Sequence, residues 1–198
     1  MKKIIIIVFI TLNIPVYAQW ELLTQVTPIL NDVQCISENT VVVVGAQGLI
    51  MKSIDGGLNW NTQSIGNSRF LKKVQFKNES VGYILGLEGV GTDIFKTIDG
   101  GETWISILNS QLPDIIDFSC VNQDIIYITF EDGSLKKSTD GGANFQSVNN
   151  DIGIDKIQFI TENIGYGSDG VTVFKTINAG VNWVKIFHVE QPTFDSAI

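Results

Sequence analysis

Arginine and histidine are almost absent from this sequence: Arg69 and His188 are the single example of each among 198 residues. Acidic residues outnumber basic ones 21 to 13, which gives a formal net charge of −8. A protein that binds a nucleic-acid backbone needs a basic stripe, so we expect no nucleic-acid partner. One histidine and two cysteines also supply no clustered set of zinc ligands. We therefore expect no metal site and no cofactor.

The first 18 residues have the features of a secretory signal peptide. Two lysines near the start precede an apolar run, Ile4–Ile10, and residues 16–18 (VYA) form an A-x-A-like cleavage site. The apolar run is too short for a spanning helix, which needs about 20 residues. We expect residues 1–18 to be removed and residues 19–198 to be exported as one domain, secreted or periplasmic, with no transmembrane span after cleavage. An uncleaved membrane anchor is the alternative.

An eight-residue motif recurs four times, about 40 residues apart. Each copy has a Ser or Thr, an Asp or Asn two positions later, a Gly after two more, and a final aromatic residue. The four copies are Ser53, Asp55, Gly57 and Trp60; Thr97, Asp99, Gly101 and Trp104; Ser138, Asp140, Gly142 and Phe145; and Thr176, Asn178, Gly180 and Trp183. A fixed period of this length is typical of a repeat fold in which each copy belongs to one structural unit.

Short apolar stretches precede each motif, as Val74–Phe76 and Val81–Ile84 do before the second copy. Helical periodicity is missing from residues 19–198. Four short strands in about 40 residues, separated by Gly and Asp turns, are the pattern of a propeller blade. The sequence therefore predicts an all-β chain, a β-propeller with blades at residues 29–65, 70–110, 114–149 and 153–190.

The motif Ser/Thr-x-Asp-x-Gly-x-x-Trp resembles the Asp box, also called the bacterial neuraminidase repeat. Its Asp can accept hydrogen bonds from backbone N–H groups of the turn that follows, and its Gly supplies the positive φ of that turn. The final aromatic packs back over the hairpin. The fourth copy has Asn178 for Asp and Ala179 for Gly, so we expect its turn to be the loosest.

Two stretches, Glu79–Tyr83 (ESVGY) and Glu162–Tyr166 (ENIGY), make a more specific sequence signature than the Asp box alone. Together with the box they resemble the photosystem II stability/assembly factor family and its relatives in non-photosynthetic bacteria. The resemblance implies an exported, non-catalytic scaffold for protein binding or complex assembly. The plant and cyanobacterial members bind a partner protein through an Arg-rich patch, whereas this sequence contains Arg69 alone.

Asp-box propellers also include enzymes, so two catalytic sets must be considered. Sialidases grip the substrate carboxylate with three arginines, and one arginine cannot do this. Glycoside hydrolases need two carboxylates across the scissile bond, and no spacing singles out a pair here. We therefore predict that the chain is not an enzyme. A glycan-binding or glycoside-hydrolase-like protein remains the alternative, so the expected partner is another extracytoplasmic protein or a glycan.

The two ends of the repeat array differ from its middle. The stretch from Trp20 to Gln25 resembles the strand that follows each box, and residues 191–198 resemble the start of a further blade. These features favour an incomplete copy of a larger propeller, or a truncated remnant of one. A natural ring of four blades is the alternative.

We expect a candidate binding face at the end of the propeller opposite the Asp boxes. Its hairpin tips carry Gln47, Glu88, Asp93, Asp132 and Asp169, and the connections between blades add Arg69 with Asn67, Gln111, Asp114, Asn150 and Asp151. The longest tip is expected at Leu87–Asp93.

Two further groups of residues recur at matching positions of the repeats. Cys35 and Cys120 are expected to be buried in first strands, too far apart for a disulfide. The recurring lysines are expected on outward-facing strand positions without a function of their own; they are Lys52, Lys96, Lys137 and Lys175.

Overall fold

The computed structural model describes residues 28–66, 69–89, 91–110, 114–148 and 153–189. Within these ranges the chain forms four antiparallel four-stranded sheets, and no helix is found there. We call the sheets blades 1 to 4. Their strands are β1 (Leu30–Cys35), β2 (Val41–Gly45), β3 (Leu49–Ser53) and β4 (Asn61–Ser64); β5 (Arg69–Phe76), β6 (Gly82–Glu88), β7 (Gly91–Thr97) and β8 (Ile105–Ser110); β9 (Ile115–Cys120), β10 (Ile126–Phe130), β11 (Leu135–Ser138) and β12 (Gln146–Val148); and β13 (Lys156–Phe159), β14 (Gly165–Ser168), β15 (Thr172–Thr176) and β16 (Val184–His188).

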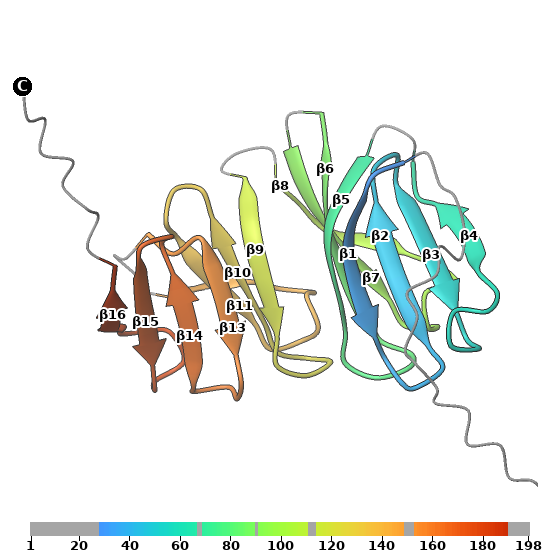
Figure 1. Cartoon of the computed structure of the whole chain (residues 1–198). Helices are drawn as coiled ribbons and strands as arrows, with labels where there is room; N and C mark the ends of the chain where they lie inside the picture. The colour runs from blue at the N-terminus through green and yellow to red at the C-terminus, as the bar shows by residue number, and fades with distance from the viewer. Residues whose placement is uncertain (1–27, 67–68, 90, 111–113, 149–152, 190–198) are drawn as a thin grey trace, which may run out of the picture.

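Each sheet pairs its strands in chain order, so every connection inside a blade is a hairpin. The blades stand side by side in an arc, with blade 1 at one end and blade 4 at the other (Figure 1). The first strands β1, β5, β9 and β13 are neighbours from blade to blade, because side chains of β1 bond the backbone of β5 and side chains of β9 bond that of β13. The four sheets are the four units that the repeat predicts.

Side chains alternate between the two faces of each sheet and bury apolar surface wherever a described blade lies alongside. This produces three separate cores, one at each junction between blades. Between blades 3 and 4, for example, the rings of Tyr127 and Phe159 stack with centroids 3.6 Å apart. Phe159 also meets Trp183 of the fourth Asp box edge to face at 5.8 Å. Stability therefore comes mainly from contacts between adjacent repeats.

The Gly-Tyr stretches have a packing role at these junctions. A Cβ on Gly82 would lie 2.7 Å from the ring of Phe76, and a Cβ on Gly165 would lie equally close to Phe159. Glycine is required there because the ring of the first strand lies flat against the second strand. The tyrosine that follows Gly82 reaches the next blade, where the hydroxyl of Tyr83 donates to the carbonyl of Gln123 at 2.8 Å.

The expectation that the recurring lysines have no function of their own is wrong for three of the four. Lys52 donates to the carbonyl of Gly100 at 2.7 Å, and Lys96 donates to that of Gly141 at 2.8 Å. Lys137 pairs with Glu162 at 2.7 Å. Each ammonium group contacts the Asp-box end of the next blade, so these lysines connect neighbouring blades.

Cys35 corrects a second expectation, since it is exposed whereas Cys120 is buried. The residues at the matching positions, Phe76 and Phe159, are also buried. Cys35 lies on the face of blade 1 that points away from blade 2, and no described sheet covers that face. Both cysteines are free thiols, as expected.

Several expectations fall outside the described residues. They are the signal peptide at residues 1–18, the strand-like stretch from Trp20 to Gln25, the segment 191–198, and the connection residues Asn67, Gln111, Asn150 and Asp151. Across the ranges that the structure describes, no helix is both long and apolar enough to cross a membrane.

Candidate functional site

The Asp-box turns are built by one hydrogen-bond pattern. In the second copy the hydroxyl of Thr97 donates to Asp99 at 2.7 Å and accepts from the N–H of Gly101 at 2.8 Å. The carboxylate of Asp99 also accepts from the N–H and the hydroxyl of Thr103, at 2.9 and 2.5 Å. Both oxygens of the carboxylate are therefore occupied inside the turn. Ser53 with Asp55, and Ser138 with Asp140, repeat the arrangement.

Hydrogen bonds to the charged form lower the pKa of these carboxyl groups. The side chain and then the backbone of Asn144 hold the pKa of Asp140 at about 2, against an ordinary value of 3.8. The pKa values of Asp55 and Asp99 are lowered for the same reason, by Asn59 and Thr103 respectively. A carboxylate stabilised in this way is a poor proton donor or acceptor near neutral pH. The aspartates of the boxes therefore stabilise the turns.

The fourth box is held by longer hydrogen bonds. Thr176 donates to the side chain of Asn178 at 3.1 Å, and the N–H of Gly180 reaches Thr176 at 3.0 Å. Ala179 takes a φ of 59°, a left-handed conformation that costs a residue with a Cβ more than it costs glycine. The degenerate motif thus forms the same turn with longer hydrogen bonds than the other three copies, and the expectation that this turn is the loosest stays a prediction.

Hairpin tips and connections between blades do meet at the end opposite the boxes. The N–H of Gly48, beside Gln47, donates to the carbonyl of Arg69 at 2.8 Å, and the N–H of Glu131 donates to that of Asp114 at 2.8 Å. Gln47 and Asp132 are exposed at their tips. Asp169 accepts the N–H groups of Val171 and Thr172 at 3.0 and 2.7 Å. We call this end of the described chain the tip face; its described residues include Gln47, Asp114, Glu131, Asp132 and Asp169.

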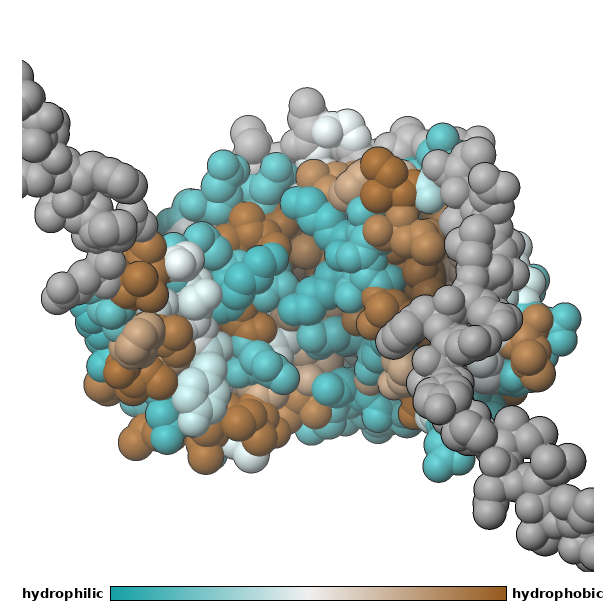
Figure 2. Space-filling model, viewed as in Figure 1, coloured by the Kyte–Doolittle hydropathy of each residue, from teal (hydrophilic) through white to brown (hydrophobic). Residues whose placement is uncertain are grey.

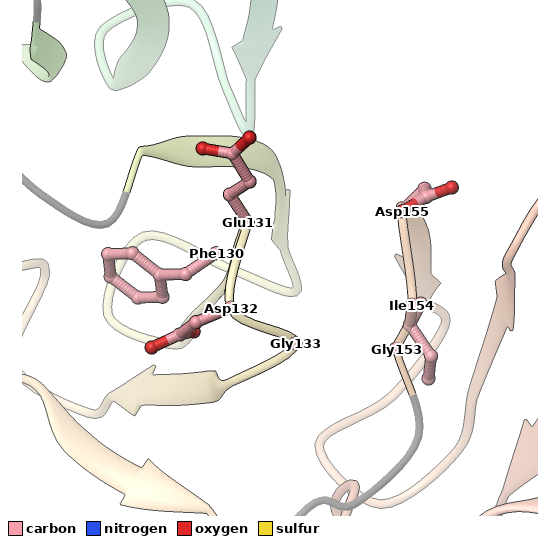
Figure 3. Close-up of a pocket in the computed structure, with 7 residues that line it drawn as sticks. All are labelled: Phe130, Glu131, Asp132, Gly133, Gly153, Ile154 and Asp155. Atoms are coloured by element: carbon pink, nitrogen blue, oxygen red, sulfur yellow. The ribbon is translucent and has the colours of Figure 1, made fainter.

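A groove of about 390 Å³ lies on the tip face between blades 3 and 4. It is lined by the β10–β11 turn, Phe130 to Gly133, and by residues 153–155 that lead into β13. Glu131 and Asp132 point to opposite sides of that turn, and Asp155 lies across the groove from them (Figure 3). All three carboxylates are exposed, so the groove presents negative charge to solvent.

Asp93 does not belong to the tip face, which corrects that expectation. The pairing of β6 with β7 continues to Glu88 and Gly91, so the loop is shorter than expected and Asp93 lies within β7. Asp93 is 2% exposed and accepts a hydrogen bond from Ser106 at 2.7 Å. Arg69 begins β5, and its guanidinium stacks 4.8 Å from the ring of Phe95. The guanidinium group of Arg69 therefore packs against an aromatic ring of its own blade.

A row of charged side chains along the first strands was not predicted from the sequence. Asp32, Lys73, Asp117 and Lys156 occupy one position in the four repeats. Asp117 is 2% exposed, pairs with Lys73 of blade 2 at 2.7 Å and accepts the N–H of Ile157 of blade 4 at 2.9 Å. We call these four residues the first-strand row. The repeat alignment shows their alternating charge, but only the fold shows that they face one another.

The imidazole Nδ1 of His188 lies 2.9 Å from the hydroxyl of Thr172, on exposed strand β16. In the five ranges that the structure describes, no three His, Cys, Asp or Glu side chains gather as metal ligands would. The arrangement offers surfaces for contact: the tip face and the two end blades.

Four Asp-box sheets arranged around an arc define a β-propeller of the Asp-box class, and the predicted fold is confirmed. The chain belongs to the family described as Photosynthesis system II assembly factor YCF48, whose profile matches residues 12–157. The resemblance expected from the Gly-Tyr stretches is thereby confirmed.

Individual relatives agree with this assignment. The chain is 29% identical over 161 residues to the photosystem II stability/assembly factor HCF136, chloroplastic, of Arabidopsis thaliana, a match that covers 73% of this chain and 33% of that protein. The chain therefore spans about a third of the length of this curated relative.

Solved structures share the fold at lower identity. YCF48 bound to a D1 peptide superposes with a TM-score of 0.68 at 19% identity, covering 89% of this chain and 59% of that one. An ancestral GH74 enzyme superposes with a TM-score of 0.60 at 15% identity, covering 79% and 25%. At these identities the likeness establishes the propeller architecture alone.

Proposed function

We propose that this chain is an exported, non-catalytic scaffold that binds a partner protein during the assembly of a complex. Membership of an assembly-factor family carries the proposal. The superposition on a relative whose structure holds a peptide supports it, because the shared fold can present loops to an extended segment. The N-terminal pattern of residues 1–18 is the reason for proposing export.

The tip face is the surface that we assign to this binding. Loops on a rigid scaffold commonly carry recognition, and this face combines described hairpin tips with residues that border the connections between blades. The acidic groove formed by Glu131, Asp132 and Asp155 favours a partner segment that carries Lys or Arg. The single arginine is held against Phe95, so an Arg-rich patch is not the means of recognition that we propose here.

The test is affinity capture from envelope extracts of the native host, with the complete chain tagged at its C-terminus. A double variant, Glu131→Lys with Asp155→Lys, reverses the charge of the groove at two exposed positions. Asp124→Lys with Glu79→Lys is the charge-matched control, because both carboxylates are exposed near the Asp-box end, where the backbone beside them bonds Gly141 and Gly100.

We expect the wild type and the control to recover the same defined protein, identified by mass spectrometry, and the groove variant to recover at least about tenfold less. Failure of the wild type to recover any protein contradicts the proposed function. Hydrolysis of a glucan by the wild type would contradict its non-catalytic part.

A further inference from the structure

The groove on the tip face between blades 3 and 4 has two hydrogen-bonded walls. One wall is the β10–β11 turn, in which the N–H of Phe130 donates to the carbonyl of Ser134 at 3.0 Å and the N–H of Gly133 donates to that of Phe130 at 2.9 Å. The other wall leads into β13, where the N–H of Asp155 donates to the carbonyl of Ser168 at 2.8 Å. Walls fixed in this way need little reordering when a ligand binds, which lowers the free-energy cost of binding.

Glycine keeps this groove open. Both Gly133 and Gly153 line it, and the turn at Gly133 faces residues 153–155 across the gap (Figure 3). A Cβ on Gly133 would lie 3.5 Å from the Cα of Gly153, so a larger side chain at this position would extend to the opposite wall. The two apolar residues of the lining, Phe130 and Ile154, are 2% and 1% exposed. The accessible walls therefore consist of backbone and of acidic side chains.

The groove carries carboxylates without ion-pair partners. Glu131, Asp132 and Asp155 line it and are exposed, and none of the three forms a salt bridge with a described residue. The ammonium group of Lys136 lies over the ring of Phe130, 4.6 Å from its centroid. Hydrophilic side chains gather at this end over blades 3 and 4 (Figure 2). A concave site lined by one sign of charge concentrates the opposite charge from solution, so the groove attracts a cation.

The shape of the groove favours a long cationic side chain over a bare metal ion. Glu131 and Asp132 diverge to opposite sides of the turn (Figure 3), and among the described residues no three His, Cys, Asp or Glu side chains gather as metal ligands would. The volume of about 390 Å³ has room for a side chain together with ordered water. Lysine and arginine combine an apolar stem, which can lie along the glycine backbone, with a charged head that bonds carboxylates.

We propose that the groove receives one lysine or arginine side chain from an extended segment of the partner. The stem of this side chain lies between Gly133 and Gly153, and its charged head bonds Glu131 and Asp155. The segment itself rests on the proposed function, which supplies the partner protein. Gly133 determines specificity, because a side chain at this position closes the groove. Lys156 follows Asp155 but belongs to the first-strand row and does not line the groove, so it leaves the carboxylate available.

The test uses the purified full-length chain and short peptides, acetyl-Gly-Gly-X-Gly-Gly-amide, in which X is Lys, Arg, Nε-acetyl-lysine or Glu. Binding is followed by the NMR shifts of the backbone N–H groups of Gly133 and Gly153 in isotope-labelled protein. We expect dissociation constants on the order of 1 mM for the Lys and Arg peptides. Removal of the charge in acetyl-lysine should weaken binding at least about tenfold. Tighter binding of the Arg peptide assigns the head to a guanidinium group, and tighter binding of the Lys peptide assigns it to an ammonium group.

Two variants of the groove separate charge from shape. Glu131→Gln with Asp155→Asn removes both charges at exposed positions and should weaken the Lys peptide at least about tenfold. Gly133→Asn places an amide across the groove at a φ of 80°, a left-handed conformation that asparagine tolerates, and should weaken the same peptide. Glu79→Gln with Asp124→Asn, at exposed positions near the Asp-box end, changes the net charge equally and should bind as the wild type does.

Equal binding of the Lys and acetyl-lysine peptides overturns the proposal, as does a groove double variant that binds like the wild type. Undiminished binding to folded Gly133→Asn overturns the placement of the stem. A wild type that shows no shift at about 10 mM peptide also overturns the proposal. These results leave the proposed function standing, because affinity capture can still recover a partner that binds elsewhere on the tip face. Failed capture together with intact peptide binding contradicts the proposed function and retains the groove.

Discussion

The ion pair at the centre of the array allows a quantitative test of how the blades are joined. Lys73→Met retains most of the apolar stem but removes the ammonium group that faces Asp117. The carboxylate is 2% exposed and the lysine side chain 25% exposed. Loss of the lysine leaves a buried charge with one backbone donor, that of Ile157, so we expect the free energy of unfolding to fall by about 3 kcal/mol.

Removing the charge of Asp117 should lower the free energy of unfolding less than removing that of Lys73 does. Asp117→Asn keeps an oxygen for the N–H of Ile157, and the partly solvated lysine still has the carbonyl of Phe118. We expect a loss of about 1 kcal/mol. The double variant removes both charges and should lose about 1 to 1.5 kcal/mol, which gives a coupling of about 2.5 kcal/mol.

The assay is equilibrium unfolding in urea, followed by tryptophan fluorescence near neutral pH. Because blades 2 and 3 meet at this pair, Lys73→Met should also broaden the transition as the two halves of the array uncouple. Lys72→Met, at the exposed neighbouring position, should stay within about 0.5 kcal/mol of the wild type. Simple additivity of the two single variants would refute the view that this pair fastens the junction.

Three other perturbations follow from the same geometry. Gly82→Ala drives a methyl group into the ring of Phe76 and should cost about 1–3 kcal/mol in urea unfolding. Tyr127→Phe removes the 2.7 Å hydrogen bond to the carbonyl of Glu162 and should cost about 1 kcal/mol by the same assay. Asp140→Asn removes a carboxyl whose pKa is lowered from 3.8 to about 2. The stability from that carboxylate is complete above 3.8 and lost as the pH falls towards 2, so the variant should show a flatter loss of stability in acid titration.

Each of these variants has a matched control. Gly153→Ala adds its methyl group to open space, and Tyr166→Phe removes a hydroxyl that has no partner among the described residues. Both should stay within about 0.5 kcal/mol of the wild type in dilute protein. Asp124→Asn, which removes an exposed carboxylate outside the boxes, is the control for Asp140→Asn. Equal effects of a variant and its control would show that the named contact contributes nothing.

The blades could be predicted because their determinants are local. In the box at Asp99, all the bonded partners lie within four residues of it, so the motif and its spacing are sufficient to indicate a hairpin. The tip of blade 2 was harder to predict, since Thr92 and Asp93 lack the apolar character of a strand. Their pairing with Leu87 and Gly86 is set by the neighbouring strand and by burial against blade 3.

The junctions could not be predicted because a repeat alignment gives the direction of a side chain and not its neighbour. Cys35 and Cys120 share one position, yet among the described sheets one packs over Cys120 and none over Cys35. The lysines were misinterpreted for the same reason. Lys96 and Lys137 are ordinary surface residues in a strand pattern, and their acceptors, Gly141 and Glu162, belong to the following repeat.

The alternating charge of the first-strand row restricts how an array of this kind can change in length. Removing one blade, for example blade 2, would bring Asp32 against Asp117 and leave two carboxylates in one desolvated site. Inserting a copy of any single blade would create a similar clash of like charges. Removal or insertion of two adjacent blades preserves the order of acid and base, so this row favours changes of repeat number in even steps.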